Sequence, residues 1–282
     1  MNVIERIREG VQDLPTLPTI YSALCDVISS PRSTAGDVAK VIATDQASTL
    51  KLLRIANSAF FGLSGRIENI SRAVVVLGFD EVRNIILAST VMNLFQKYPV
   101  LQRFRPRDFW AHSIAVGLAS RLLGKLAGVK HLENFFVTGI LHDIGKVFFF
   151  EFLDKEYPKV LEIVEKKKCL LRDAELEVLG LDHSLVGSMM ADQWRLPEPI
   201  RNAIHYHHFG MQGGETNLLV ACIHIGDILA RALELGYAGD DFIPQPNEST
   251  WETLRLKGGM IRKMVPELLR DHEEAMRTMF LN

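Results

Sequence analysis

A histidine and an aspartate stand next to each other, at His142 and Asp143, inside a strongly apolar stretch of the chain. This stretch covers residues 135 to 150 and consists mainly of Phe, Val, Ile, Leu and Gly. Water cannot easily reach either side chain there, and a carboxylate buried without a partner is costly or stays protonated. Any fold of this chain must therefore bring a metal ion, a cation or a dense set of hydrogen bonds to the pair.

The rest of the chain has the pattern of helices joined by short turns. Apolar residues recur at spacings of three and four, and no segment of convincing length alternates apolar and polar residues as a half-buried strand would. Prolines and glycines, as in the segment Leu14 to Pro18, separate these periodic segments. We therefore predict an all-α protein with two lobes, the first of them a helical bundle.

Two turn-rich segments suggest where the parts of the chain begin and end. Pro99 and Pro106 flank a short polar segment, and the chain changes character past Gly236, where residues 239 to 249 resemble a linker. We predict an N-terminal helical lobe at 1–100, a second helical domain at 101–236, and a C-terminal linker with amphipathic helices at 237–282.

Composition excludes several classes of function. The net charge is −2, and the densest basic run, residues 166 to 168, is flanked by acidic residues, so no nucleic-acid partner is expected. Three cysteines without CxxC spacing fit reduced thiols better than disulfides or a thiolate zinc site. No signal peptide is apparent, and no apolar run reaches the ~18 residues of a membrane span. We expect a cytoplasmic protein without a membrane partner.

Four other predicted helices repeat the anomaly of the His142–Asp143 pair. Each places histidine or aspartate in phase with the apolar residues of its inward face. One such histidine is usually a hydrogen-bonded core residue. Five inward-facing helices that each carry one are hard to explain in this way, so the side chains are candidates for a shared site. They are His112, His183, His207, His208 and Asp227.

Together with His142 and Asp143, these residues resemble in order and rough spacing the metal ligands of the HD superfamily of phosphohydrolases, especially the HD-GYP cyclic-dinucleotide phosphodiesterases. The whole chain looks most like an HDOD protein, an HD-related output domain. This second resemblance covers roughly residues 10 to 235 and rests in the first half on residues 14–18, 45–62 and 70–78. It implies that the second lobe is HD-like and that the protein is a bacterial-type signalling module.

The candidate ligands suit a divalent transition metal. Imidazole nitrogen and carboxylate oxygen favour octahedral ions, with Fe or Mn preferred, and the lack of thiolates argues against a structural zinc site. Seven ligands exceed the needs of one ion, so we expect one or two. The first would take His112, His142, Asp143 and Asp227. The second would take His183, His207 and His208, with Asp143 bridging.

Lys146 has two interpretations. It lies three residues after Asp143, which suits an ion pair, and by resemblance to HD-GYP proteins it would instead contact a phosphate. In the second case Lys146 and Asp143 are the candidate catalytic residues. One departure counts against cleavage of cyclic dinucleotides: where HD-GYP enzymes continue with an acid and a Gly-Tyr-Pro loop, this chain has Phe209 and no such loop.

Two further groups of residues have a predicted role. Gly139 and Gly145 weaken a helix interior, which fits a need to leave room for an ion or ligand. In the first lobe, four polar side chains in helical context are surface or capping groups, or else part of an interaction surface that transmits a signal. These are Arg54, Asn57, Ser58 and Arg83.

The leading hypothesis is a regulatory HDOD module that binds metal in its HD-like pocket. It would act by a ligand-dependent change in its interaction with a signalling protein, with a nucleotide-type phosphate as a further ligand. The alternative is a metal-dependent phosphohydrolase acting on a nucleotide or cyclic nucleotide. A third hypothesis, a scaffold whose histidines satisfy one another, predicts stability that is indifferent to chelators.

Overall fold

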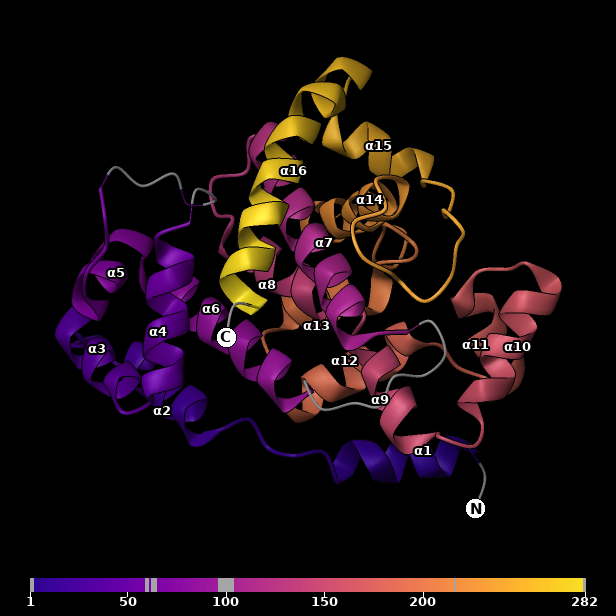
Figure 1. Cartoon of the computed structure of the whole chain (residues 1–282), viewed down its shortest axis with the longest axis horizontal. Coiled ribbons are helices and arrows are strands. Elements are labelled where there is room, and N and C mark those ends of the chain that lie inside the picture. Colours follow the sequence, from indigo (N-terminus) through magenta and orange to yellow (C-terminus); the bar gives the residue numbers. More distant parts are fainter. Residues whose placement is uncertain (1–2, 59–60, 62–64, 96–103, 216, 281–282) are drawn as a thin grey trace. The chain divides into compact units, whose positions relative to one another are not determined.

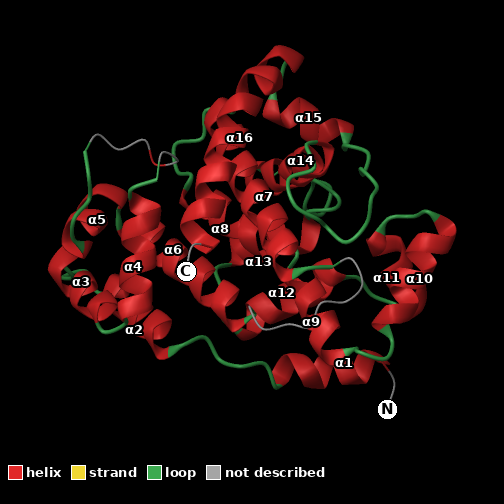
Figure 2. Cartoon of the chain, viewed as in Figure 1, coloured by secondary structure: helices red, strands yellow, loops and turns green. Residues whose placement is uncertain are grey.

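The computed structural model describes residues 3–58, 61, 65–95, 104–215 and 217–280. Throughout these ranges the regular structure is helical, and no strand is formed (Figure 2). This confirms the all-α class predicted from the spacing of apolar residues. Among the described helices, none combines the length and the apolar character needed to cross a membrane.

The chain groups into two compact units. One unit comprises Met1–Pro15 and Lys97–Met264, and the other comprises Thr16–Gln96 and Val265–Asn282. Each unit is thus built from two pieces of chain that are distant in the sequence. The division into a helical lobe at 1–100, a second helical domain at 101–236 and a C-terminal linker with helices at 237–282 stays a prediction.

The smaller unit is a bundle of short helices around one apolar core. Leu24, Ile42, Leu52 and Ile85 are at most 1% exposed at its centre. Its helices are α2 (Thr19–Ser29), α3 (Ala35–Ala43), α4 (Gln46–Ala56), α5 (Ile70–Leu77), α6 (Phe79–Leu94) and the second part of α16 (Gly258–Phe280).

The larger unit holds the His142–Asp143 pair. Its helices α7 and α14 pack against each other, α7 also packs on α8, and α12 packs on both α9 and α13 (Figure 1). The helices are α1 (Val3–Gln12), α7 (Pro106–Leu126), α8 (Glu133–Leu141), α9 (Ile144–Phe152), α10 (Tyr157–Lys167), α11 (Leu171–Leu179), α12 (His183–Gln193), α13 (Glu198–Tyr206), α14 (Leu218–Ala232), α15 (Glu248–Leu254) and the start of α16.

Glycines let the backbones in this unit approach closely around the pair. A Cβ on Gly139 would lie 2.4 Å from the Cα of Gly117 on α7, and one on Gly145 would lie 2.0 Å from the carbonyl oxygen of His183 on α12. The space beside both glycines is therefore filled by neighbouring helices. The expectation that they leave room for an ion or ligand was wrong: they bring the helices that carry the site together.

The segment between α14 and α15 is more than a linker. Residues 236–247, which we call the strap, contain no helix. Asp240 of the strap is 6% exposed and Ala238 is 3% exposed. The Asp240 carboxylate accepts hydrogen bonds from the backbone N–H groups of Leu171 and Phe242. Buried polar groups of this kind hold the strap against the body of the unit.

One of the helices in the C-terminal segment contains a proline, Pro266. A single helix, α16, continues through Pro266. Proline removes one backbone donor and crowds the preceding turn, but packing can keep a helix continuous at that cost. Here Met264 and Leu268, on either side of the proline, are 4% and 0% exposed, so the apolar face is anchored across it.

Replacing Gly145 tests the close packing of α9 on α12. Gly145→Ala forces a Cβ against a backbone oxygen that cannot rotate away, so we expect a loss of about 2 kcal/mol or more and a lower melting temperature. Gly259→Ala is the matched control, because no atom lies within 4 Å of its Cβ position in α16. It should gain up to ~1 kcal/mol from helix propensity. Equal melting temperatures for the two variants would contradict the packing.

Asp45 caps α4 and offers a test in the smaller unit. Its carboxylate accepts from the N–H groups of Ala47 and Ser48, and hydrogen bonding by Ser48 lowers the pKa of Asp45. A lowered folded pKa stabilises the protein above the unfolded pKa of ~3.9, and this contribution disappears as the pH falls through the folded value.

Asp45→Ala should therefore cost about 1 kcal/mol at pH 7 in denaturant unfolding, with a smaller loss at pH 2 to 3. Asp45→Asn keeps a capping oxygen and should be nearly neutral at pH 7. A loss for Asp45→Ala that is the same at both pH values would show that the charged form of the cap contributes nothing.

Candidate metal centre

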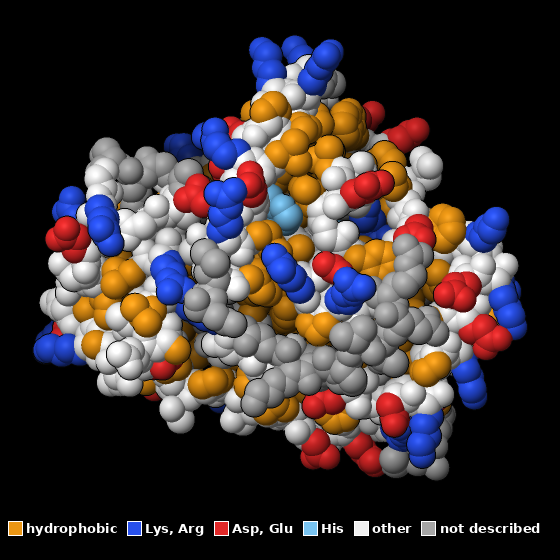
Figure 3. All heavy atoms as spheres, viewed as in Figure 1, with side chains coloured by type: hydrophobic (Ala, Val, Ile, Leu, Met, Phe, Trp, Pro, Cys, Tyr) orange, Lys and Arg blue, Asp and Glu red, His pale blue; other side chains and the backbone are white. Residues whose placement is uncertain are grey.

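All seven side chains predicted as ligands converge in the larger unit. They come from α7, the α8–α9 junction, α12, the end of α13, and α14. Six of them are at most 3% exposed, and His208 is partly exposed. Little histidine surface is visible on the face of the molecule shown in Figure 3. The inward orientation predicted from helical spacing is therefore found at each of these positions.

The His142–Asp143 pair sits at a break between two helices. α8 ends at Leu141 and α9 begins at Ile144, so the pair does not lie within a continuous helix as its sequence context suggested. Asp143 has φ −100° and ψ 11°, and its carbonyl oxygen accepts from the N–H of Lys146 in a tight turn. The break coincides with the point where Gly145 passes His183, which leaves no room for a straight path.

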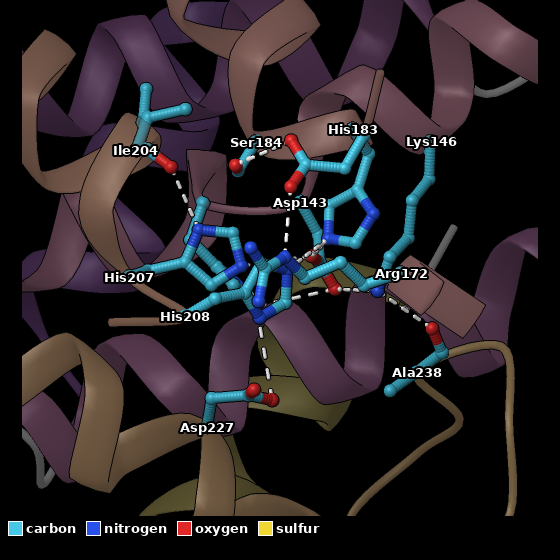
Figure 4. Close-up of polar contacts among 12 residues, drawn as sticks. Asp143, Lys146, Arg172, His183, Ser184, Ile204, His207, His208, Asp227 and Ala238 are labelled. Carbon is cyan, nitrogen blue, oxygen red and sulfur yellow. Dashed lines mark hydrogen bonds and ion pairs between the residues drawn. The ribbon is translucent and has the colours of Figure 1, made fainter. Parts of the chain in front are cut away.

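Asp143 is the centre of the cluster, and its two carboxylate oxygens face different partners (Figure 4). Oδ2 lies 3.2 Å from Nε2 of His142 and 3.7 Å from Nε2 of His112. Oδ1 lies 3.0 Å from Nε2 of His183 and 3.6 Å from Nε2 of His207. The carboxylate can thus bridge two groups of ligands, as the assignment from the sequence required.

Three of the histidines are oriented through the ring nitrogen that faces away from Asp143. Nδ1 of His142 lies 2.7 Å from the carbonyl oxygen of Gly139, and Nδ1 of His207 lies 2.7 Å from that of Ile204. Nδ1 of His183 lies 2.5 Å from Oε2 of Glu175. Carbonyl and carboxylate oxygens accept a hydrogen bond from Nδ1–H. In a neutral imidazole, Nε2 then carries the lone pair that can bind a metal. This arrangement is typical of histidines that bind metals.

His183 and His208 face each other through the same type of atom. Their Nε2 atoms are 2.8 Å apart, so one proton must lie between them when no metal is bound. Burial alone lowers the pKa of His183, but the Glu175 and Asp143 carboxylates outweigh it and raise the pKa to about 9. Burial lowers the pKa of His208 well below the usual range, and His207 adds to this effect. The proton therefore belongs to His183.

Two buried cations compensate the carboxylates. Lys146 is fully buried and donates to Oδ2 of Asp143 at 2.6 Å and to the carbonyl oxygen of Ala238 at 2.8 Å. Arg231 donates through Nε to Oδ1 of Asp227 at 3.0 Å and through Nη1 to Oδ1 of Asp240 at 2.9 Å. The ion pair of Lys146 with Asp143 is thus present, and its contact with a phosphate stays a prediction.

These charges keep both aspartates ionised. Burial by itself raises the pKa of Asp143, but His142, Lys146 and His183 together hold it well below the usual range. For Asp227, burial is likewise outweighed by Arg231 and His112. The pKa values of His112 and His207 are lowered by burial, in His207 strongly. The cluster therefore offers ionised carboxylates and neutral imidazoles at His112 and His207, and a metal ion would have to displace the proton of His183.

The donor atoms also lie close enough to share an ion. Three sets of ligand atoms lie within 4.8 Å of one another: His112 with His142 and Asp227, His142 with Asp143 and His207, and His183 with His207 and His208. Nε2 of His112, His142 and His207 and Oδ1 of Asp143 are buried without a hydrogen bond of acceptable geometry. Buried polar atoms are rarely left so, and metal ligation within these three sets would satisfy them. The residues present thus fit a metal.

Several residues of the site were not found from the sequence. Arg231 lies four residues after Asp227, so the ion pair could have been read from the helical spacing. Glu175 gives no such signal, because it lies on α11 and reaches His183 only through the fold. Asp240 was assigned to a linker, where an exposed acid is expected. A further histidine, His224, accepts the N–H of Asn247 at Nε2.

The four polar residues singled out in the first half lie apart from this cluster, in the smaller unit, and three of them have structural partners. Asn57 hydrogen bonds to the backbone of Leu53 and Ile67, and Ser58 donates to the carbonyl oxygen of Ile55. Arg83 pairs with Asp80 at 2.9 Å. The capping and surface interpretation is supported for these three.

Removing the Lys146 cation tests the charge balance. In Lys146→Met the Asp143 carboxylate stays buried without its ion pair, so the metal-free protein should lose about 3–5 kcal/mol. Added Mn²⁺ should restore much of the loss. Lys166→Met is the control, because this lysine pairs with Glu162 on the surface. Its replacement should change the melting temperature little. A Lys146→Met protein as stable as the control would contradict the account.

The comparisons with known proteins agree with this geometry. A model of the HDOD domain family matches residues 14–209. An HDOD domain protein of unknown function from Geobacter sulfurreducens has a crystal structure with a TM-score of 0.81, 26% identity, and coverage of 99% of this chain and 98% of that chain. A "Putative metal-dependent phosphohydrolase" from Shewanella amazonensis SB2B shares the fold, with a TM-score of 0.70, 16% identity, and coverage of 98% and 97%.

A curated relative is longer than this chain. The protein, from Treponema pallidum (strain Nichols) and described as uncharacterized, is 26% identical over 203 residues, which is 72% of this chain and 39% of the relative. The chain thus spans about two fifths of the length of the curated relative that it matches. Since the HDOD model covers well over half of the sequence, the chain belongs to the HDOD domain family.

Proposed function

We propose that this chain is a regulatory module that holds a divalent transition metal ion in its buried centre and changes its interaction with a signalling partner when the ion binds. The observation that carries the proposal is a ligand set that is both complete and enclosed. Oriented Nε2 atoms converge on the Asp143 carboxylate, and six of the seven ligands are at most 3% exposed.

Charge balance favours a single ion. The buried carboxylates of Asp143, Glu175, Asp227 and Asp240 face three buried cations, Lys146, Arg231 and protonated His183, which leaves one excess negative charge. One divalent ion that replaces the His183 proton makes the cluster neutral. A second ion would leave two excess positive charges in a poorly solvated interior, which is costly unless an anion such as a phosphate accompanies it.

Burial of the centre favours regulation over turnover. A hydrolase must place its substrate against the metal and a nucleophilic water, so the ligands of a catalytic ion border an open position. Here Lys146, the candidate phosphate contact, is fully buried between Asp143 and Ala238. Phe209 stands where an acidic residue would follow the paired histidines. In this closed arrangement Lys146 cannot contact a nucleotide phosphate without leaving Asp143 and Ala238.

Metal binding would act on the fold itself. The ligands come from α7, the α8–α9 junction, α12, α14 and the residue pair after α13, so one ion ties together segments far apart in the sequence. An ion that binds only the folded arrangement stabilises it, and the stabilisation grows with the logarithm of the ratio between the ion concentration and the dissociation constant. A partner that prefers this arrangement then binds the loaded protein more tightly. Fe and Mn suit the mixed imidazole and carboxylate set.

The runner-up is a metal-dependent phosphohydrolase acting on a nucleotide or cyclic nucleotide. Its support is the bridging geometry of Asp143, whose two oxygens face the two ligand groups that a pair of ions would occupy. In that case Asp143 and Lys146 act at the reacting phosphate. A conformation with the centre open to substrate is then required.

Metal content and turnover, measured together, separate the two functions. Protein purified without oxygen and loaded with Fe²⁺ or Mn²⁺ is analysed for bound metal, for the melting temperature before and after chelation, and for hydrolysis of nucleotides and cyclic nucleotides. The variants are Asp143→Asn and His207→Gln. His205→Gln is the matched control, because this histidine lies on α13 two residues before His207 and is half-buried outside the cluster.

We expect about one ion per chain in the wild type and in His205→Gln, a lower melting temperature after chelation, no turnover, and little metal in the other two variants. About two ions with hydrolysis that disappears in Asp143→Asn would establish the phosphohydrolase instead. If none of these proteins contains metal, the third hypothesis is supported, a scaffold whose histidines satisfy one another.

A further inference from the structure

A cavity of about 470 Å³ lies beneath the strap and reaches the metal centre. Its lining includes His112 and Arg231 together with most of the strap residues between Gly236 and Ile243. His112 is 1% exposed, and its Nε2 lies 3.1 Å from Oδ1 of Asp227 without forming a well-aligned hydrogen bond. A buried, unsatisfied ligand nitrogen therefore belongs to a residue that borders a space large enough for a hydrated ion.

The strap is held beside this cavity by Arg231, the same cation that neutralises the buried carboxylate of Asp227. Arg231 holds Asp227 through Nε and strap residue Asp240 through Nη1, and it also donates to the carbonyl oxygen of Phe242 at 3.2 Å. At the other end of the cavity, the N–H of Tyr237 donates to the carbonyl oxygen of Asp108 at 2.9 Å. One guanidinium thus connects a metal ligand to the cover above it.

Binding of a divalent ion at Asp227 would change the contacts of Arg231 with Asp227 and with the strap. An ion at Oδ1 of Asp227 takes the electron pairs that now accept from Arg231, and it places two positive charges beside the guanidinium. The Arg231 side chain is 6% exposed, so water screens this repulsion poorly. Arg231 therefore has to move with the ion, and Asp240 is the acid it already contacts on the strap.

The two approaches to the centre differ in charge. The wall of the cavity carries the exposed carboxylates of Glu234 and Asp241, which raise the local concentration of cations. On the opposite approach, the partly exposed His208 is followed by Phe209, over whose ring the Arg172 guanidinium lies at 4.4 Å. The acids of the cavity wall therefore favour the approach of a cation, whereas near Phe209 the charge of Arg172 is balanced by its ion pair with Asp182.

We propose that divalent metal ions reach the buried centre through the cavity beneath the strap, with His112 as the first ligand, and that the Asp240–Arg231 ion pair is the latch that opens and closes this passage. The inference rests on the proposed metal-binding function and adds its route and its control. The ion pair breaks, the strap lifts, the ion passes Glu234 and Asp241 to Nε2 of His112, and the strap closes after Arg231 has turned from Asp227 toward Asp240.

The rates of metal uptake and loss test the latch. Co²⁺ binding to the whole chain is followed by stopped-flow absorbance, and loss is followed after mixing with excess EDTA. Asp240→Asn keeps an oxygen for the Phe242 N–H, but it removes the ionic contact with Arg231 and the acceptor for the Leu171 N–H, so both contacts of Asp240 that hold the strap down are weakened. We expect both rates to rise about tenfold, while the dissociation constant changes much less, since the barrier falls and the bound state is largely unaltered.

Two other variants test the route. Glu234→Gln combined with Asp241→Asn should slow uptake at low salt and lose this effect at high salt, because it removes the attraction of the cavity mouth. Phe209→Ala loosens the opposite approach and should leave both rates unchanged. Acceleration by Phe209→Ala without acceleration by Asp240→Asn would overturn the route.

Hydrogen exchange supplies a readout on the unaltered protein. If the strap must open for uptake, the wild-type uptake rate at saturating Co²⁺ cannot exceed the opening rate measured at the N–H groups of Tyr237 and Phe242. Uptake faster than this opening would overturn the latch even if Asp240→Asn failed to fold. A wild type that binds no Co²⁺ at equilibrium would refute the proposed function itself, whereas normal binding with unchanged Asp240→Asn rates refutes the latch alone.

Discussion

The structure of the larger unit depends on compensating one buried carboxylate. Asp143 is fully buried, and an isolated charge in that position would be destabilising enough to unfold a domain of ordinary stability. Four histidines and Lys146 surround it, and each comes from an element that must be in place before the carboxylate is satisfied. The demand made by the sequence at His142 and Asp143 is met in part locally, by His142 and Lys146, and in part by the convergence of α7, α12 and the end of α13 on the carboxylate.

The same convergence limits what the site can do. Glycines at 117, 139, 145 and 187 let α7, α8, α9 and α12 meet at backbone distance, and the strap covers the remaining side. Such close packing orients ligands well and excludes water, which favours tight and selective metal binding. It also excludes a large substrate, so the features that suit the centre to hold an ion are those that count against turnover in the closed form.

Much of this was predictable because helical periodicity places residues on faces. The all-α class and the inward positions of His112, His183, His207 and Asp227 follow from apolar neighbours three and four residues away. Contacts made across the fold are not encoded in this way. Glu175 and Asp240 look like surface acids in their own segments, and the break at His142–Asp143 depends on backbone crowding by α12. Because contacts across the fold are not visible in the sequence, Gly139 and Gly145 were expected to leave room for an ion, although they allow neighbouring helices to pack closely.

X-ray absorption spectroscopy on Mn²⁺-loaded protein tests the central claim most directly, because it reports the atoms bound to the ion. The account predicts a first shell of nitrogen and oxygen only, with the outer-shell scattering of several imidazole rings, and a reduced imidazole signal in His207→Gln. A shell made of water and carboxylate oxygen without imidazole would show that the ion sits elsewhere on the protein, and the buried cluster would then be a scaffold of histidines and ion pairs.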